Sequence, residues 1–171
     1  MRMETLLVRI LQDNELTSGV WRTSGGIIMI KSELMTLWNV ESWTVEPYGV
    51  YIVSRRLGTN RLENVGQAFQ NLNISCTDYT EAEVLSLPMW EQLYVQLDKL
   101  DQLAQEIIQK EIPQEESVVL TLTDIMLDKS GCYDAFALGY DIGESPAGHL
   151  YVLVSFDENF TAQQDVIYET L

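Results

Sequence analysis

The chain has 171 residues, 46% of them apolar and 21% charged, a length and composition typical of one globular domain with its own core. Ten basic residues stand against 26 acidic ones, and a field of that sign disfavours nucleic acid and anionic membranes as partners. No apolar run reaches the ~20 residues of a membrane span, and no signal-peptide pattern opens the chain, so we expect a cytoplasmic protein.

The charge is distributed unevenly along the chain. Residues 1–61 hold seven basic and six acidic residues, whereas residues 62–171 hold three basic and twenty acidic ones. We expect a single domain over 1–171, with a less acidic, strand-rich part at 1–61, a helical middle at 62–112 and an acidic, strand-rich part at 113–171. The acidic excess favours a basic protein partner. The alternative is that the acidity serves only solubility.

The first residues read mainly as strands. Residues 5–11 are apolar and β-branched enough for an opening strand. The two glycines at 25–26 predict a hairpin-like break before the apolar residues 27–30. The stretch 31–40 fits either a strand or a short helix, because a short apolar run does not settle its own period.

A turn is predicted in the middle of the strand-rich part. Pro47 precedes Gly49 by two residues, an order typical of a tight turn. The flanking residues 42–45 and 50–53 are rich in β-branched and aromatic side chains. We therefore expect two adjacent strands joined by this turn.

The middle of the chain reads as helical. Apolar residues at steps of three and four predict a short helix at 62–71, and Thr80 followed three residues later by Glu83 matches a capping box. The strongest element is a helix at about 88–111, which Pro113 should stop. Its apolar face consists of Trp90, Leu93, Tyr94, Leu97, Leu100, Ala104, Ile107 and Ile108.

The last third returns to strand patterns. Residues 118–127 alternate and then slip phase, which predicts a bulge or bend, and 128–131 reads as a hairpin turn. Residues 143–148 read as a loop, and 150–156 are apolar on both faces, as in a central strand. Residues 165–168 fit either an edge strand or a short helix.

The predicted strand at 133–140 has one large and one small face. The large face is Phe136, Leu138 and Tyr140, and the small face is Ala135, Ala137 and Gly139. Because small residues allow close approach, we expect the long helix to lie over the small face. The order of strands, helices and strands predicts an α+β fold, an antiparallel sheet with the helix at about 88–111 packed on one face, rather than a doubly wound parallel fold.

The sequence contains no recognisable catalytic constellation. His149 is the single histidine and has no partners at metal-ligand spacing, so we interpret it as a hydrogen-bonding residue at a strand end. Cys76 and Cys132 lack metal or redox spacing and are expected to be free thiols. If 133–140 and 150–156 form a hairpin, Cys132 lies roughly 26 Å from His149, which excludes a dyad between them.

Acidic side chains gather around the late turns. The candidate metal-binding groups are Asp124 with Asp128 and Asp134, Asp141 with Glu144, and Asp157 with Glu158. None matches the twelve-residue calcium loop, and turn-forming aspartates explain them more simply. Nucleotide-binding and hydrolase motifs are also missing. We therefore expect no metal and no cofactor.

Our leading hypothesis is a small binding protein of the immunity or antitoxin type, whose acidic C-terminal two-thirds docks a basic partner. The expected partner-binding residues are the carboxylates of the late loops: Asp128, Asp134, Asp141, Glu144, Asp157 and Glu158. Opposite charges on two proteins attract each other and speed their association, which suits an acidic protein that occupies the basic cleft of its partner.

Two alternatives stay open. The first is a homo-oligomeric assembly or regulatory domain, for example a homodimer, whose apolar interface is made of aromatic side chains in the N-terminal third, near three arginines. These side chains are Trp21, Trp38, Trp43, Tyr48, Arg22, Arg55 and Arg56. The second is an enzyme that uses a pair of carboxylates.

Overall fold

The computed structural model describes residues 21–23, 26–57, 69–111 and 120–170. Its elements in chain order are β1 (Trp21–Thr23), β2 (Gly26–Ile28), α2 (Lys31–Leu37), β3 (Val40–Glu46), β4 (Gly49–Leu57), β5 (Phe69–Thr77), α3 (Glu81–Ser86), α4 (Trp90–Glu111), β6 (Leu122–Asp128), β7 (Phe136–Ser145), β8 (Gly148–Phe156) and β9 (Ala162–Thr170). The strand expected at 5–11 lies outside the described residues.

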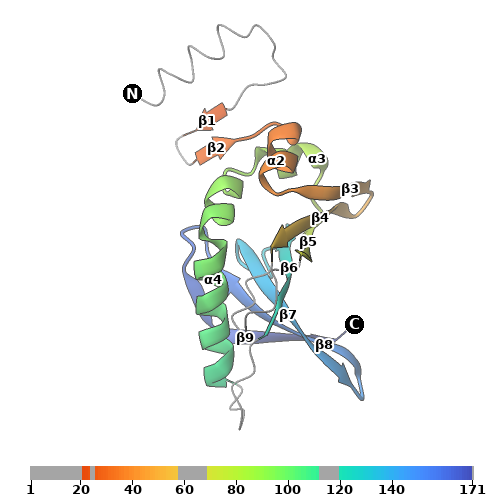
Figure 1. Cartoon of the computed structure of the whole chain (residues 1–171), viewed down its shortest axis with the longest axis vertical. Helices are drawn as coiled ribbons and strands as arrows, with labels where there is room; N and C mark the ends of the chain where they lie inside the picture. The colour runs from red at the N-terminus through yellow and green to blue at the C-terminus, as the bar shows by residue number, and fades with distance from the viewer. Residues whose placement is uncertain (1–20, 24–25, 58–68, 112–119, 171) are drawn as a thin grey trace, which may run out of the picture.

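The described part of the chain forms a seven-stranded sheet in the order β3-β4-β5-β6-β7-β8-β9, and β1 pairs separately with β2 (Figure 1). Every neighbouring pair in the large sheet is antiparallel except β5 and β6, which run parallel. Two antiparallel meanders, β3–β5 and β6–β9, are therefore joined by a crossover through α3 and α4. The α+β class with a mostly antiparallel sheet and one long helix is confirmed.

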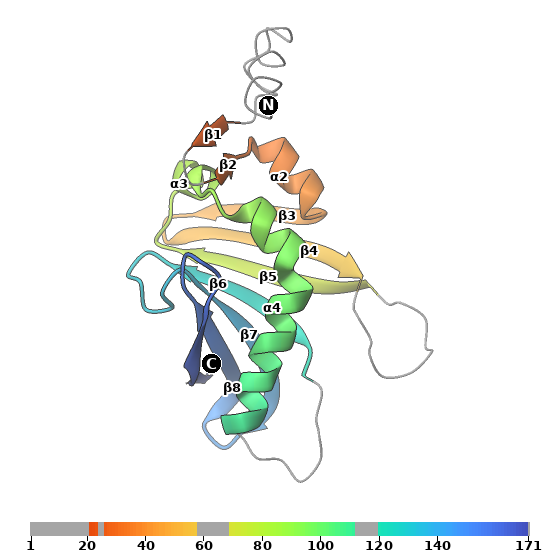
Figure 2. The ribbon, with the colours of Figure 1, turned by 90° about the vertical axis from the view of Figure 1, so that its left-hand side faces the viewer.

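The long helix α4 lies across one face of the sheet (Figure 2). Seven side chains of its apolar stripe are buried, namely Trp90, Leu93, Leu97, Leu100, Ala104, Ile107 and Ile108. Tyr94 was expected on the same stripe but is 45% exposed. The Trp90 indole donates a 2.9 Å hydrogen bond to the carbonyl oxygen of Val84, which ties the start of α4 to α3. The spacing of apolar residues in the sequence predicted this helix correctly, because its buried side chains recur along the whole length of α4.

Local signals also placed the turn and cap correctly. The turn at Pro47 and Gly49 joins β3 to β4, as predicted. At α3, the Thr80 hydroxyl accepts a hydrogen bond from the Glu83 backbone N–H, and the Glu83 carboxylate accepts one from the Thr80 N–H. Both groups lie close in sequence, so the pattern alone determines the contact. The ambiguous stretch 31–40 contains helix α2 followed by the start of β3.

The short helix predicted at 62–71 is wrong at its C-terminal end. Residues from Phe69 onward form strand β5, and 62–68 lie outside the described residues. In β5 the side chains of Leu72, Ile74 and Cys76 are buried at every second position. Pairing with β4 and β6 imposes this period of two, and tertiary burial outweighs the short helical spacing before it.

The expected position of α4 over the small face of β7 is also wrong. Tyr140, from the large face, donates a 2.6 Å hydrogen bond to Asp101 of α4, and Phe136 and Leu138 join the same buried core. Large side chains fill the space between the helix and the sheet, whereas the small residues face the other side. There Gly139 lies against Leu153 and Asp124, with no room for a side chain.

The late strands are longer than predicted. Strand β7 continues to Ser145 and β8 begins at Gly148, so the loop expected at 143–148 is only a tight turn. The phase slip predicted in β6 is present as a register shift between Leu122 and Asp124. The segment expected at 165–168 belongs to β9, which forms an edge of the sheet.

Candidate functional site

The candidate site lies on the face of β6–β9 that points away from α4, called the open face below. Strands β6 to β9 contain six acidic residues and one histidine but neither lysine nor arginine. The six are Asp124, Asp128, Asp141, Glu144, Asp165 and Glu169. In the described part of the chain, α4 lies on one side of β6–β9 and no helix covers the opposite, open face (Figure 1).

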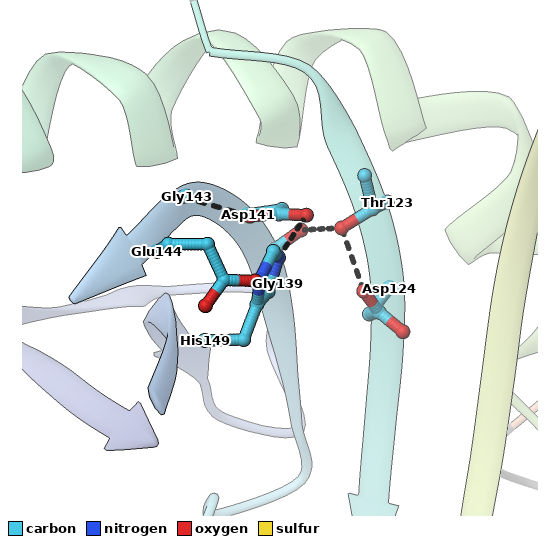
Figure 3. Close-up of polar contacts among 7 residues, drawn as sticks. All are labelled: Thr123, Asp124, Gly139, Asp141, Gly143, Glu144 and His149. Atoms are coloured by element: carbon cyan, nitrogen blue, oxygen red, sulfur yellow. Dashed lines mark hydrogen bonds and ion pairs between the residues drawn. The ribbon is translucent and has the colours of Figure 1, made fainter. Parts of the chain in front are cut away.

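A group of three charged side chains occupies the β7–β8 end of the open face. The His149 Nε2 atom lies 2.6 Å from Asp141 Oδ2, and its Nδ1 atom lies 2.8 Å from Glu144 Oε1 (Figure 3). A neutral imidazole has only one N–H, so both contacts are hydrogen bonds only when the ring is protonated. The arrangement therefore favours the imidazolium form of His149.

The backbone of β7 explains why these groups meet. A bulge between Asp141 and Gly143 leaves the side chain of Asp141 near His149, and Glu144 lies directly opposite His149 in the register. The Asp141 carboxylate also accepts a 2.8 Å hydrogen bond from the Gly143 N–H. Gly143 has a φ of +101°, a conformation that other residues rarely adopt, so this glycine permits the bulge.

The charges of this group shift the pKa values in opposite directions. The hydrogen bonds with Asp141 and Glu144 raise the pKa of His149, because both carboxylates stabilise the protonated ring. The hydrogen bonds from His149 and from the Gly143 N–H lower the pKa of Asp141. The exposed surface at this end of the sheet therefore keeps one positive and two negative groups in contact.

Asp124 lies on the neighbouring strand, in the middle of the open face. Its Oδ2 atom accepts a 2.6 Å hydrogen bond from the Thr123 hydroxyl, which also lies 3.3 Å from the carbonyl oxygen of Gly139 (Figure 3). Burial raises the pKa of Asp124 and the charge of Asp141 raises it further, although hydrogen bonds from Thr123 and Asn73 oppose the rise. The charged form of this carboxylate is thus disfavoured by its surroundings.

Tyr151 connects these carboxylates. It pairs with Asp141 in the register, and its ring centroid lies 5.3 Å from that of His149. Partial burial raises the pKa of Tyr151, and the charges of Asp141, Asp124 and Glu144 raise it further. Tyr151 therefore lies beside Asp141, and the negative charges of Asp124 and Glu144 also act on its hydroxyl.

The β6–β7 loop reaches across the open face as far as Glu169, which pairs with Tyr151 in the register. The Tyr133 hydroxyl donates a 2.5 Å hydrogen bond to Glu169 on β9, and burial followed by this bond raises the pKa of Tyr133. Ala137 and Leu153 are fully buried although they point away from α4. The His149 group stays accessible beside this contact, because the side chains of Asp141 and Glu144 are 36% and 80% exposed.

The predicted binding residues fall into two groups at opposite ends of the sheet. Asp141 and Glu144 belong to the His149 group. Asp128 ends β6, Asp134 precedes β7, and Asp157 and Glu158 follow β8, all at the other end of these strands. Phe136 pairs with Phe156 at that end of the β7–β8 hairpin. Seven to eight residues of strand separate the two groups, on the order of 25 Å.

The second group is used mainly to shape turns. The Asp128 carboxylate accepts a 2.8 Å hydrogen bond from the Ser130 N–H, and hydrogen bonds from Ser130 lower the pKa of Asp128. Asp157 accepts hydrogen bonds from the N–H groups of Asn159 and Thr161. The side chain of Asp134 accepts a 3.3 Å hydrogen bond from Gln163, and Glu158 is exposed. These contacts match the turn-forming role expected of such aspartates.

The arrangement offers little to acid–base, nucleophilic or metal chemistry. Both nitrogens of His149 are engaged by carboxylates, and burial raises the pKa of Cys76 to about 12. Cys132 lies in the β6–β7 loop, at the opposite end of β7 from His149. Among the described residues, no group of three or more His, Cys, Asp or Glu side chains is arranged to hold a metal ion.

The aromatic side chains of the N-terminal third do not share one exposed patch. Trp38 is 2% exposed and belongs to the core, and Trp43 donates its indole N–H to a carboxylate of α3. Tyr48 is 73% exposed at the β3–β4 turn. The side chains of Trp21 and Arg22 lie outside the described residues.

Sequence reasoning missed the partners of His149 and the central position of Tyr151. The signal was the two-residue turn at Pro146 and Ala147, which places Glu144 opposite His149. The contact with Asp141 additionally requires the β7 bulge, which Gly143 permits. Because the sequence analysis predicted residues 143–148 as a loop, it missed both contacts of His149.

The chain was compared with known proteins and structures. No protein family, curated protein or solved structure matches it. Within the described residues, no helix is both long and apolar enough to cross a membrane. The fold and the site alone thus define the class of this protein: an α+β protein whose sheet has one helix-covered face and one acidic open face.

Proposed function

We propose that the protein is a cytoplasmic binding protein that docks a basic protein partner through the open face, as an immunity or antitoxin-type inhibitor does. The observation that carries the proposal is the set of three carboxylates, Asp124, Asp141 and Glu144, around Tyr151 on strands without lysine or arginine. Carboxylates beside a tyrosine suit an incoming arginine or lysine, because the ring packs the side chain and the carboxylates neutralise its charge.

The electrostatics of Asp124 support the same conclusion. Its charged form is disfavoured by burial and by the charge of Asp141, which lies on the adjacent strand. A cationic side chain placed between these two groups removes the repulsion, so part of the binding free energy comes from relief of unfavourable charge. His149 supplies the one cationic group within these strands, and it engages only Asp141 and Glu144.

The test compares two variants with the same net charge. The open-face variant carries Asp124→Asn, Asp141→Asn and Glu144→Gln. The helix control variant carries Glu91→Gln, Glu106→Gln and Glu111→Gln on α4. Each tagged protein is used for a pull-down from native lysate at low and high salt, and bound proteins are quantified by mass spectrometry.

The proposal predicts at least one basic protein that binds the wild type and the helix control variant, is released by high salt, and is lost from the open-face variant. Capture that is equal for both variants would mean that net charge, not the open face, drives binding. Absence of any basic protein at low salt would also contradict the proposal.

A further inference from the structure

A cavity of about 450 Å³ lies on the helix-covered side of the molecule, apart from the open face. Its walls come from the end of α2, the C-terminal part of β4 and the first turns of α4. Trp38, Tyr94, Val95 and Leu97 give it an aromatic and aliphatic lining, and Arg56 and Asp98 contribute charge. This size and mixture are typical of small-molecule sites.

The polar lining has more hydrogen-bond donors than partners for them. The Trp38 Nε1 and the Arg56 Nη1 atoms are both buried, and neither has a hydrogen-bond partner within the described part of the chain. A buried donor without a partner costs about 1–3 kcal/mol, so such groups are rarely left unpaired without a reason. A ligand that brings hydrogen-bond acceptors would satisfy them.

The carboxylate that now contacts Arg56 is easily displaced. Asp98 Oδ1 lies 2.6 Å from Arg56 Nη2, a contact through one nitrogen of the guanidinium. The Asp98 side chain is 66% exposed, whereas that of Arg56 is only 18% exposed. An exposed partner gains little from such a pair, and a planar guanidinium binds an incoming carboxylate through two parallel hydrogen bonds.

We propose that this cavity binds a small carboxylic acid with an aromatic or branched apolar body. The carboxylate replaces Asp98 on Arg56, and the apolar body lies against Trp38 and Tyr94. Three other polar side chains of the lining are engaged within the protein: the Ser54 hydroxyl donates to the Trp38 carbonyl, the Asn39 amide donates to the Arg55 carbonyl, and the Arg55 guanidinium pairs with Glu41. The site is independent of the open face and of any protein partner.

The test uses phenylacetate as the probe and its uncharged analogue phenylacetamide as the matched ligand. Binding to the full chain is followed by the indole N–H resonances in nitrogen–proton correlation spectra, with the Trp38 signal assigned from Trp38→Phe. We expect saturable binding of phenylacetate that moves the Trp38 signal. Phenylacetamide and inorganic phosphate should bind at least about tenfold more weakly, because each lacks either the charge or the apolar body.

Three variants separate this site from unspecific binding. Arg56→Gln should weaken phenylacetate binding about 10- to 100-fold, and Lys99→Gln, which removes the same charge elsewhere on the surface, should leave it unchanged. Asp98→Asn should tighten binding roughly two- to fivefold, because the competing carboxylate is gone. The spectra themselves show whether each variant is folded.

Two outcomes would overturn the proposal. The first is no saturable shift of the Trp38 signal at millimolar phenylacetate in either the wild type or Asp98→Asn. The second is binding that phosphate matches or that a folded Arg56→Gln variant retains. Neither outcome depends on the open-face carboxylates.

Discussion

The two faces of the sheet differ in what they do with their polar groups. On the face covered by α4, buried polar side chains pair within the protein, as Tyr140 does with Asp101 and Ser54 with the Trp38 carbonyl; the exceptions lie at the cavity, where Trp38 Nε1 and Arg56 Nη1 have no partner in the described part of the chain. On the open face, Asp124, Asp141 and Glu144 gather around Tyr151 with a single histidine as counter-charge. Away from the cavity, the covered face pairs its polar groups within the protein, whereas the open face carries negative charge that an external partner can neutralise.

This difference suggests a division of labour, in which the covered face stabilises the fold and the open face binds a partner. Apolar burial beneath α4 provides the stability, since hydrophobic burial is the dominant favourable contribution to folding. The open face buries Ala137 and Leu153 but also carries a carboxylate, Asp124, whose charged form is disfavoured. Functional sites often cost stability that the rest of the fold supplies. The following predictions test this division.

The largest effect is expected on the covered face. Trp90 is fully buried and its indole bonds to Val84, so Trp90→Ala should lower the free energy of unfolding by about 3–5 kcal/mol. Val95 lies on the same helix but is 74% exposed, and Val95→Ala should change stability by less than about 0.5 kcal/mol. Urea unfolding followed by circular dichroism measures both. Similar losses for the two variants would show that α4 does not carry the core.

An intermediate effect is expected where the open face is tightly packed. A Cβ atom at Gly139 would lie 2.9 Å from Leu153 Cδ2 and 3.0 Å from Asp124 Cβ. Gly139→Ala should therefore cost about 1–3 kcal/mol. Because Leu153→Ala removes one of the two clashes, the double variant should lose less than the sum of the single losses. If urea unfolding shows that the losses of the two single variants add up in the double variant, the Gly139→Ala side chain does not clash with Leu153.

A small effect of opposite sign is expected at Asp124. The pKa of Asp124 is raised in the folded protein, so its charge costs stability at neutral pH; that cost declines as the pH falls through the folded pKa and is gone below the ordinary aspartate pKa of about 3.9. Asp124→Asn should raise the unfolding free energy by up to about 1 kcal/mol at pH 7, a limit that allows for its partial exposure. The gain should disappear in acid. A loss of stability at pH 7 would contradict the division of labour.

The smallest effect concerns the pH dependence of His149. Its raised pKa means that the ion pairs stabilise the fold fully below the ordinary histidine pKa, about 6.5, and that this contribution is lost as the pH rises through the folded pKa. His149 is the single histidine, so its ring protons give an unambiguous titration by nuclear magnetic resonance. The midpoint should lie above 6.5 in the wild type and fall in the double variant Asp141→Asn, Glu144→Gln. Equal midpoints would exclude the ion pairs.

Sequence reasoning succeeded where a structural feature is determined locally. The stripe of α4, the capping box at Thr80 and the turn at Pro47 and Gly49 each depend on neighbours within a few residues. It failed at β5, because the pairing of Leu72, Ile74 and Cys76 with distant strands decides their period. An element whose secondary structure depends on pairing with distant strands cannot be predicted from a short stretch of sequence.

The same limit explains the site. Asp141 and Glu144 were predicted as binding residues from their charge and loop position, but their contact with His149 depends on the register of the β7–β8 hairpin. A shift by one residue in that register reverses which face each side chain occupies. The choice of the covered face of β7 failed for a related reason, because it rested on side-chain size without the volume that Tyr140 fills beneath α4.

The central claim is that the open face binds a basic protein. Its most direct test is the dissociation constant of the purified, captured partner for the wild type, the open-face variant and the helix control variant, measured by isothermal titration calorimetry at two salt concentrations. We predict a large loss of affinity in the open-face variant, little change in the helix control variant, and a wild-type affinity that falls with salt. Equal affinities for the two variants would contradict the claim.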